Sequence, residues 1–320
     1  MMPVLEVIDP GLSTTIQDSG RPGFRDIGVP ASGPLDRISF RLANAIVGNH
    51  SGAPALEMLM LGPTLKILAE SVRVALVGSD AGMETGRDNV RRISSGRSIR
   101  LSRGEVFRVT PLDDSACAYL AIEGGIRVVP VLGSASTNVR GRIGGFHGRR
   151  LEQGDQLPLE LNSVHLRAEY AMARSLDLGF DDPIRVILGP QADYFTDEAI
   201  KTFLSSDYTV SSQSDRMGYR LEGPALTHLK GYNIVSDGIV TGAIQVPGSG
   251  HPIVLMADNP TTGGYPKIAT VISADVPLIA RRRPGRRIRF AAVDLREARL
   301  AYTHQEAAVQ RLVQSMAVQS

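Results

Sequence analysis

Residues 64–78 read TLKILAESVRVALVG and contain two short apolar runs, TLKIL and VRVALVG, the second of which ends at Gly78. Short runs rich in branched aliphatic residues that end at glycine are typical of strands. Further runs of this kind are RVILG (185–189), PIVLMA (252–257) and RRIRFAAV (286–293). Turns are frequent, with 33 glycines and 19 prolines in 320 residues. The sequence therefore predicts a mainly β protein, α+β in class, with a barrel or sandwich architecture.

Three segments depart from the strand pattern and predict helices. The first is 34–48, PLDRISFRLANAIVG, with Pro34 at the first helical position and Gly48 as the stop. The second begins at Thr196 and has Asp197 and Glu198 in its first turn, where acidic side chains interact favourably with the helix dipole. The third is the amphipathic C-terminal stretch 294–316.

A boundary is expected at 174–183, where polar and acidic residues separate two apolar blocks. This predicts a first barrel-like subdomain at 1–180, a second at 181–293 and a C-terminal helix at 294–320. LEMLMLGPTLKI (56–67) weakly resembles YRLEGPALTHL (219–229). Two related subdomains in tandem explain this similarity, and chance agreement between two generic β patterns explains it equally well.

The composition is that of a soluble globular protein, with 42% hydrophobic and 21% charged residues. A net charge of +2 gives no electrostatic reason for a nucleic-acid or membrane partner. The single cysteine, Cys117, lies in an apolar run and is expected to be a buried thiol in a reducing compartment. No basic-then-apolar signal pattern opens the chain. We therefore expect a cytoplasmic protein.

The common sequence signatures of self-contained catalysis are missing. The six histidines are scattered and none has metal-ligand spacing to another ligand. There is no Gly-Lys-Ser/Thr phosphate loop, no G-x-S-x-G nucleophile turn and no G-x-G-x-x-G after a strand. We expect no metal and no cofactor bound by this chain alone.

Four polar, glycine-rich segments stand out from the predicted strands and are expected to be loops: 13–36, 211–223, 240–252 and 257–275. Polar residues on loops held by a rigid scaffold often form binding sites. The turn chemistry of Asp, Asn, Ser and Gly explains any single segment at least as well.

The last of these segments, ADNPTTGGYPKIATVISAD, contains Lys267, one of only four lysines among 35 basic residues. Lysine is a point donor whose pKa responds to burial, whereas arginine is a planar fork that is always charged. Here Lys267 is expected on a polar loop, and a plain surface lysine is the alternative. Gly263 and Gly264 have no Cβ, so the backbone N–H groups of this segment can come close to an anionic oxygen.

The motifs resemble those of the carboxyltransferase family formerly called allophanate hydrolase subunit 2. They run in collinear order from about residue 5 to residue 290: TTIQDSGRPGFRDIGVPASGPLD, LANAIVGN, ALEMLMLGPTL, YLAIEGGI, SQSDRMGYRLEG and GAIQVPGSGHPIVLMADNPTTGGYPKIATVISAD. The resemblance implies a tandem of cyclophilin-like β-barrel subdomains. Members include the C component of bacterial ATP-dependent 5-oxoprolinase, a Kip-type antagonist of a kinase inhibitor, and the carboxyltransferase region of urea carboxylase.

The resemblance also implies function through partners. As the C component of a 5-oxoprolinase, the chain would act with a protein like the A component, which handles the lactam, and with a sister barrel like the B component. The complex would use ATP. Two alternatives stay open. One is a biotin-dependent carboxyltransferase acting on urea or allophanate with a separate biotin carrier, and the other is a regulatory module that binds a kinase-inhibitor partner.

The family motifs further imply a site on this chain. The implied catalytic residues are Lys267 and Asp215. The implied substrate-binding residues are Gln17, Asp18, Arg216, Gln245, Thr262, Gly263, Gly264 and Tyr265. A fixed cation and amide donors suit a reaction in which negative charge develops on a carbonyl oxygen. We expect the ring of Tyr265 to pack rather than to act as an acid.

Overall fold

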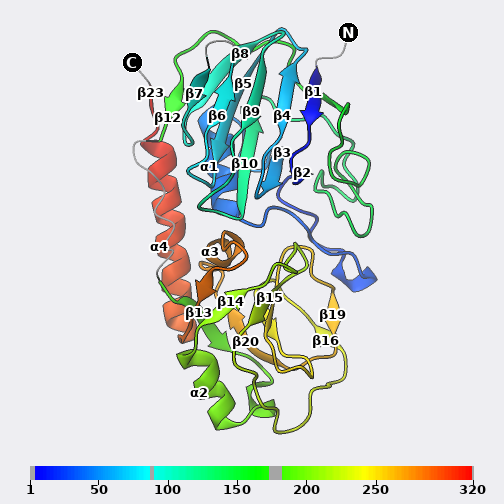
Figure 1. The fold of residues 1–320 in the computed structure, drawn as a ribbon, viewed down its shortest axis with the longest axis vertical. Helices are drawn as coiled ribbons and strands as arrows, with labels where there is room; N and C mark the ends of the chain where they lie inside the picture. Colours follow the sequence, from blue (N-terminus) through cyan, green and yellow to red (C-terminus); the bar gives the residue numbers. More distant parts are fainter. Residues whose placement is uncertain (1–3, 87–89, 173–181, 319–320) are drawn as a thin grey trace. The chain divides into compact units, whose positions relative to one another are not determined.

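The computed structural model describes residues 4–86, 90–172 and 182–318, which are mostly strands (Figure 1). Contacts divide the chain into two compact units. The first unit consists of 1–21, 32–176 and 308–320, and the second of 22–31 and 177–307. The predicted mainly β class is confirmed.

The first unit contains two antiparallel sheets. The six-stranded sheet has the order β11-β1-β4-β9-β6-β7, with β1 (Val4–Asp9), β4 (Thr64–Ile67), β6 (Met83–Thr85), β7 (Arg91–Ile93), β9 (Val106–Val109) and β11 (Gln156–Pro158). The five-stranded sheet has the order β2-β3-β10-β5-β8, with β2 (Ser13–Gln17), β3 (Ala55–Leu59), β5 (Ser71–Val77), β8 (Ser98–Ser102) and β10 (Cys117–Ile122). A short pair joins β12 (Tyr170–Ala171) to β23 (Ala317–Val318).

The core of this unit lies between the two sheets. Leu65 on β4 and Leu76 on β5 belong to one buried apolar cluster, so both runs of the 64–78 stretch contribute to it. Every residue of β5 and β10 is buried, since helix α1 (Arg37–Val47) packs against the same two strands. A strand covered on both faces is mostly apolar, and in β5 the exceptions are Ser71 and the ion-paired Arg73. Cys117 is buried on β10, as predicted.

Helix α1 begins later than the sequence suggested. Asp36 is its N-cap, and its carboxylate accepts hydrogen bonds from the N–H groups of Ile38 (2.9 Å) and Ser39 (3.2 Å). The assignment of Pro34 to the first helical position is therefore wrong, because the acidic cap two residues later fixes the start. Gly48 ends the helix with a φ of 85°, as predicted.

The second unit is an eight-stranded sheet that closes on itself. Its order is β21-β14-β15-β18-β17-β20-β13-β22, with β13 (Ile184–Leu188), β14 (Tyr208–Val210), β15 (Gly218–Glu222), β17 (Ala243–Gln245), β18 (Ile253–Leu255), β20 (Lys267–Val271), β21 (Arg287–Ile288) and β22 (Phe290–Ala292). Only Arg289 separates the two edge strands, so one segment completes the barrel. A two-stranded ribbon, β16 (Asp237–Gly238) with β19 (Thr262–Gly263), accompanies the barrel.

The remaining helices follow the sequence signals unevenly. Helix α2 (Asp197–Ser205) is capped by Thr196, and α4 (Leu295–Gln314) occupies the predicted C-terminal stretch. The short helix α3 (Val276–Ala280) and the 3-10 turns η1 (Arg25–Ile27) and η2 (Ala192–Tyr194) were not predicted. Among the described residues, no helix is both long enough and apolar enough to cross a bilayer.

An aromatic cluster packs α2 onto the second barrel. Phe203 stacks on Phe290 with ring centroids 4.6 Å apart, and Tyr208 lies 6.1 Å from Phe290. Tyr208 is fully buried, and its hydroxyl has no hydrogen-bond partner in the described part of the chain. Burial raises the pKa of Tyr208 to about 12.

Tyr208→Phe is expected to raise the free energy of unfolding by about 1–3 kcal/mol, because it removes a buried polar group that lacks a partner. The wild-type protein keeps the phenol proton between pH 10 and 12 while the unfolded chain releases it. The stability present below pH 10 is thus lost as the pH rises towards 12. Denaturant titrations of both proteins at pH 8 and pH 11 measure this difference. Tyr232→Phe, at a half-exposed tyrosine, is the matched control, and an equal gain in both variants would contradict the account.

Candidate functional site

Lys267 is the first residue of strand β20, and strand pairing places it opposite Gln245 on β17. The ladder is irregular at this point, with a register shift between Ile244 and Gln245. Both side chains are almost completely buried. The expectation that Lys267 lies on a polar loop is therefore wrong. The structure does bring two of the implied site residues, Lys267 and Gln245, onto neighbouring strands.

The ammonium group of Lys267 is held by the β16–β19 ribbon. Its Nζ lies 2.5 Å from Oδ2 of Asp237 and 3.4 Å from the carbonyl oxygen of Gly238. The lysine side chain is 6% exposed and that of Asp237 is 52% exposed. This ion pair therefore has one buried partner and one that faces water.

Asp237 is the centre of a small polar network. The Lys267 ammonium, followed by the N–H of Gly238, lowers the pKa of the Asp237 carboxyl, and the Gln191 side chain adds a further hydrogen bond. Gln191 also accepts a hydrogen bond from the backbone N–H of Lys267 at 3.3 Å. The network keeps Asp237 ionised and holds the lysine from both its backbone and its tip.

The segment before Lys267 wraps around the same network. Thr262 and Gly263 form β19 and pair with β16. A Cβ on Gly263 would lie 2.5 Å from Cδ1 of Ile239 and 2.6 Å from Nε2 of Gln245, so a larger residue would displace the ends of these two side chains. Gly264 uses its carbonyl oxygen to accept the N–H of Ile234 at 2.9 Å.

Tyr265 is partly exposed and contributes its main chain to the site. Its carbonyl oxygen accepts a hydrogen bond from Nε2 of Gln245 at 3.4 Å. Pro266 is buried, and its carbonyl accepts the N–H of Val246 at 3.1 Å. The whole stretch from Thr262 to Lys267 is thereby fixed against β17.

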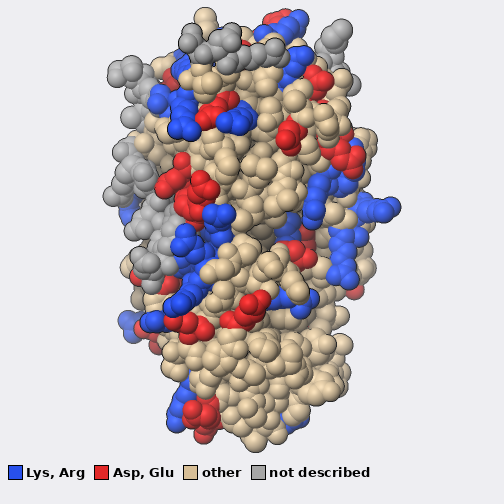
Figure 2. Space-filling model, viewed as in Figure 1, with Lys and Arg blue, Asp and Glu red and all other residues tan. Residues whose placement is uncertain are grey.

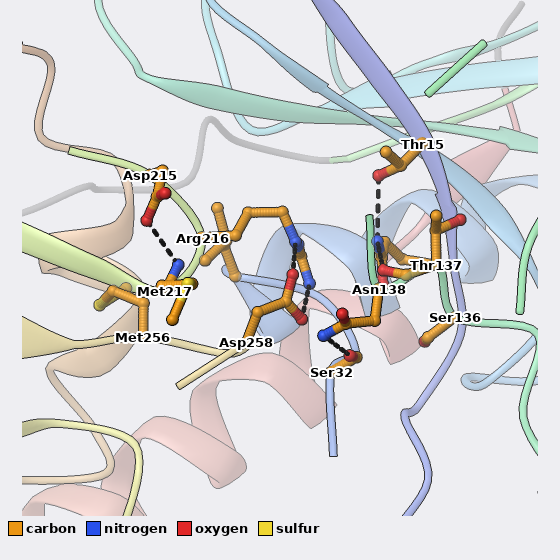
Figure 3. A network of polar contacts seen from close by, with 12 residues as sticks. Thr15, Ser32, Ser136, Thr137, Asn138, Asp215, Arg216, Met217, Met256 and Asp258 are labelled. Atoms are coloured by element: carbon orange, nitrogen blue, oxygen red, sulfur yellow. Dashed lines mark hydrogen bonds and ion pairs between the residues drawn. The ribbon is translucent and has the colours of Figure 1, made fainter. Parts of the chain in front are cut away.

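Asp215 and Arg216 follow one another in the chain but have different surroundings (Figure 3). Asp215 is exposed, and its Oδ1 accepts the N–H groups of Met217 (2.8 Å) and Gly218 (3.2 Å), which is an Asx turn. Arg216 is buried and makes a two-pronged ion pair with Asp258, at 2.8 Å from Nε to Oδ2 and 3.2 Å from Nη2 to Oδ1. The guanidinium plane is therefore fixed by a carboxylate that sequence reasoning missed.

Gln17 lies in the first unit, at the end of β2, which shows that part of the 13–36 segment is a strand and not a loop. It is fully buried, and its Nε2 donates to Oγ1 of Thr15 at 3.0 Å and to the carbonyl of Thr137 at 3.1 Å; both of these residues are labelled in Figure 3. Its Oε1 has no hydrogen-bond partner in the described chain. One acceptor of this buried amide is thus left for a further donor.

Asp18 organises the loop that follows β10 in the same unit. Its carboxylate accepts the hydroxyls of Ser134 (2.5 Å) and Ser136 (2.6 Å) and the N–H of Ala135 (2.6 Å). It also accepts the N–H of Gly20 at 2.9 Å. These contacts fix the shape of two loop segments that are more than a hundred residues apart in sequence.

The implied residues therefore fall into separate groups. Lys267, Gln245, Thr262, Gly263, Gly264 and Tyr265 share one network in the second unit, while Asp215 and Arg216 occupy their own turn and ion pair. Gln17 and Asp18 belong to the first unit. Within residues 4–86, 90–172 and 182–318, no cluster of three or more His, Cys, Asp or Glu side chains could hold a metal ion.

Sequence reasoning did not find Asp237, Gln191 or Asp258. Asp237 and Gln191 are 30 and 76 positions from Lys267 in the chain, and no local motif joins them. The only signal is the Asp237–Gly238 pair, since Asp-Gly marks a turn next to a short strand.

Comparisons with known proteins agree on one family. Residues 27–292 match the carboxyltransferase domain, subdomain A and B. The C component of 5-oxoprolinase from Escherichia coli is 37% identical over 303 residues, which cover 95% of this chain and 96% of that protein. The Haemophilus influenzae protein of the same name is 35% identical, covering 92% and 93%.

Larger proteins contain a similar region. The urea amidolyase of Lachancea kluyveri is 36% identical over 96% of this chain, which spans only 18% of that protein. The crystal structure of the Kluyveromyces lactis urea amidolyase superposes with a TM-score of 0.87 at 32% identity, over 98% of this chain and 20% of that one. The urea carboxylase structure of the same yeast also gives a TM-score of 0.87, at 33% identity over 98% of this chain and 29% of that one.

Proposed function

Because the chain belongs to the family of carboxyltransferase domains with subdomains A and B, we propose that it is a non-autonomous component of an ATP-dependent 5-oxoprolinase. The observation that carries this proposal is the pair of relatives named as the C component of 5-oxoprolinase, which match this chain over almost their whole length. The reaction opens the lactam of 5-oxoproline to give glutamate. The partners are an A-type protein and a B-type sister barrel.

The proposed contribution of this chain is a fixed cation. An ammonium group has three N–H donors, and in Lys267 two acceptors are already present, on Asp237 and Gly238. One donor is left for an oxygen of the substrate, either the lactam carbonyl or the carboxylate. Negative charge that develops on a carbonyl oxygen is stabilised most by donors that are held in place before the reaction.

The surrounding residues suit a small amide. Gln245 is held by the Tyr265 carbonyl through its Nε2, which leaves its Oε1 to accept a substrate N–H. Gly263 allows the Gln245 amide to take this position, since a Cβ on residue 263 would lie only 2.6 Å from its Nε2. Asp237 keeps the ammonium in position without neutralising the site, because a half-exposed carboxylate is screened by water.

The proposal predicts that the isolated chain is catalytically silent. Purified alone, it should hydrolyse neither 5-oxoproline nor allophanate and should not carboxylate urea. Mixed with the A-type and B-type proteins, it should give 5-oxoproline-dependent ATP hydrolysis with formation of glutamate. The partners without this chain are the control. Rapid turnover by the chain alone, or full activity of the partners without it, would refute the proposal.

A second candidate function is carboxyl transfer from a biotin carrier to urea or a related amide. It is favoured by the superposition on the yeast urea amidolyase and urea carboxylase over 98% of this chain. A separate biotin carboxylase and carrier would have to supply the carboxyl group. Biotin-dependent consumption of urea and bicarbonate by the chain with such a carrier distinguishes this function from the first.

A further inference from the structure

An exposed apolar surface borders the Lys267–Asp237 network in the second unit. We call it the ribbon patch, and it consists of Leu229, Tyr232, Val235, Val240 and Tyr265. Val235 is 92% exposed, and Val235 and Val240 lie on either side of Asp237–Gly238 in sequence. Scattered exposed aliphatic residues are ordinary on a protein surface, whereas several on one ribbon and its flanks require an explanation.

The chain segment that carries the ribbon patch contains few charged residues. In the 44 residues from Gly223 to Pro266 the only charged side chains are Lys230, Asp237 and Asp258. Asp258 is buried with Arg216, and Lys230 pairs with Asp193 outside this stretch. Figure 2 shows the result as a broad uncharged area over the loops around β16 and β19. The core of a protein interface is typically depleted of charged residues and enriched in aromatic and apolar side chains.

The ribbon patch is held in a definite shape. The N–H of Ile234 donates to the Gly264 carbonyl at 2.9 Å, and the N–H of Ile239 donates to the Thr261 carbonyl at 3.1 Å. The carbonyl of Ile239 in turn accepts a hydrogen bond from Nη2 of Arg25 at 2.6 Å. An ordered apolar surface loses little conformational entropy on docking, which favours binding.

We propose that the ribbon patch is the docking surface for the sister-barrel partner, which would present an uncharged face rich in aromatic or aliphatic side chains. This inference rests on the proposed function. A partner seated here would cover the exposed side of Asp237 and exclude water from the Lys267–Asp237 ion pair, which would strengthen the pair and hold the ammonium more firmly in place. It would also explain why the chain needs a partner for turnover.

A second copy of this chain fits the patch less well. A two-fold contact centred on the ribbon would bring the half-exposed Asp237 carboxylates of both copies towards each other. Like charges that face each other across an interface oppose association. The two curated relatives of matching length are, moreover, named as subunits of a larger enzyme.

Val235→Asp tests the proposal, with Val129→Asp as the matched control. Val129 is 84% exposed but lies in the first unit, outside the patch. A charge placed in a docked apolar surface should weaken the affinity for the B-type protein by about 10- to 100-fold, the effect of an interface hot spot. The dissociation constant is measured by calorimetry, the melting temperature of each variant is recorded, and size-exclusion chromatography with light scattering gives the mass of each species.

Weaker binding of Val235→Asp, with wild-type affinity for Val129→Asp and equal melting temperatures, supports the assignment. Wild-type affinity of Val235→Asp for a partner that does bind overturns the docking surface but leaves the proposed function standing. Failure of the unmodified chain to bind, together with no turnover in the mixture, overturns the proposed function itself. A wild-type dimer that Val235→Asp converts to a monomer assigns the patch to a second copy and overturns the proposal.

Discussion

Lys267→Ala is expected to lower the turnover of the reconstituted complex by about 10²–10³, the usual cost of losing one preorganised donor at a developing oxyanion. The effect should appear mainly in kcat, because the charge on the oxygen is greatest in the transition state. Lys267→Arg should restore little activity, since a planar fork does not fit the nearly closed position of a single Nζ beside Asp237. Steady-state rates of 5-oxoproline-dependent ATP hydrolysis measure both variants.

Stability separates a chemical from a structural role for this lysine. Lys267 is buried on β20, so its removal should cost about 0.5–3 kcal/mol of folding free energy, as for an ordinary buried substitution. That loss leaves the protein folded at 25 °C, and the remaining activity is then measured on folded enzyme. If the turnover of Lys267→Ala falls by no more than its folded fraction does, Lys267 has a structural role and not a chemical one.

Two neighbouring substitutions extend the test. Gln245→Ala should also lower turnover, since Gln245 lies opposite Lys267 in the strand register. Asp215→Ala should stay close to the wild type if its carboxylate serves only the turn to Met217 and Gly218. A large loss of turnover in Asp215→Ala at an unchanged melting temperature would instead support the catalytic role that the family resemblance implied.

The sequence singled out the segment around Lys267 as a candidate site, but it did not predict the conformation of that segment. Thr-Thr-Gly-Gly-Tyr-Pro indicates a turn, and residues 264–266 do lie outside any strand. Thr262 and Gly263 nevertheless form β19, and Lys267 begins β20, because β16 and β17 pair with them. Pairing of strands far apart in sequence overrides local propensity. For the same reason the partner Asp237, on a ribbon 30 positions away, was not visible.

The fold itself followed from local patterns where those patterns were strong. The runs of 64–78 form β4 and β5, and Gly48 and Thr196 delimit helices as predicted. The weaker cases failed for identifiable reasons. Segment 13–36 begins as strand β2 because its threonines and Ile16 are buried against β3, and residues 22–31 join the second unit through Arg25, whose Nη2 binds Asn259 at 2.9 Å. Neither tertiary contact has a signal in the neighbouring sequence.

Asp258→Ala is expected to destabilise the protein by about 3–5 kcal/mol, because it removes the carboxylate that pairs with a buried guanidinium. The Arg216 and Asp258 side chains are only 9% and 6% exposed, so water cannot replace the lost partner. Asp193→Ala is the matched control, since its ion pair with Lys230 is more than half exposed on the aspartate side and should contribute less than about 1 kcal/mol. Urea denaturation gives both values, and equal losses in the two variants would contradict the account.

The double variant Arg216→Met/Asp258→Leu separates the stability of this pair from its function. Replacing a buried ion pair by apolar residues of similar size is often neutral or stabilising, so most of the free energy lost in Asp258→Ala should return. If Arg216 also binds substrate, as the family resemblance implied, turnover of the reconstituted complex should stay low although the fold is restored. Recovery of both stability and turnover would make Arg216 a structural residue, because a methionine side chain supplies no charge or hydrogen-bond donor to a substrate oxygen.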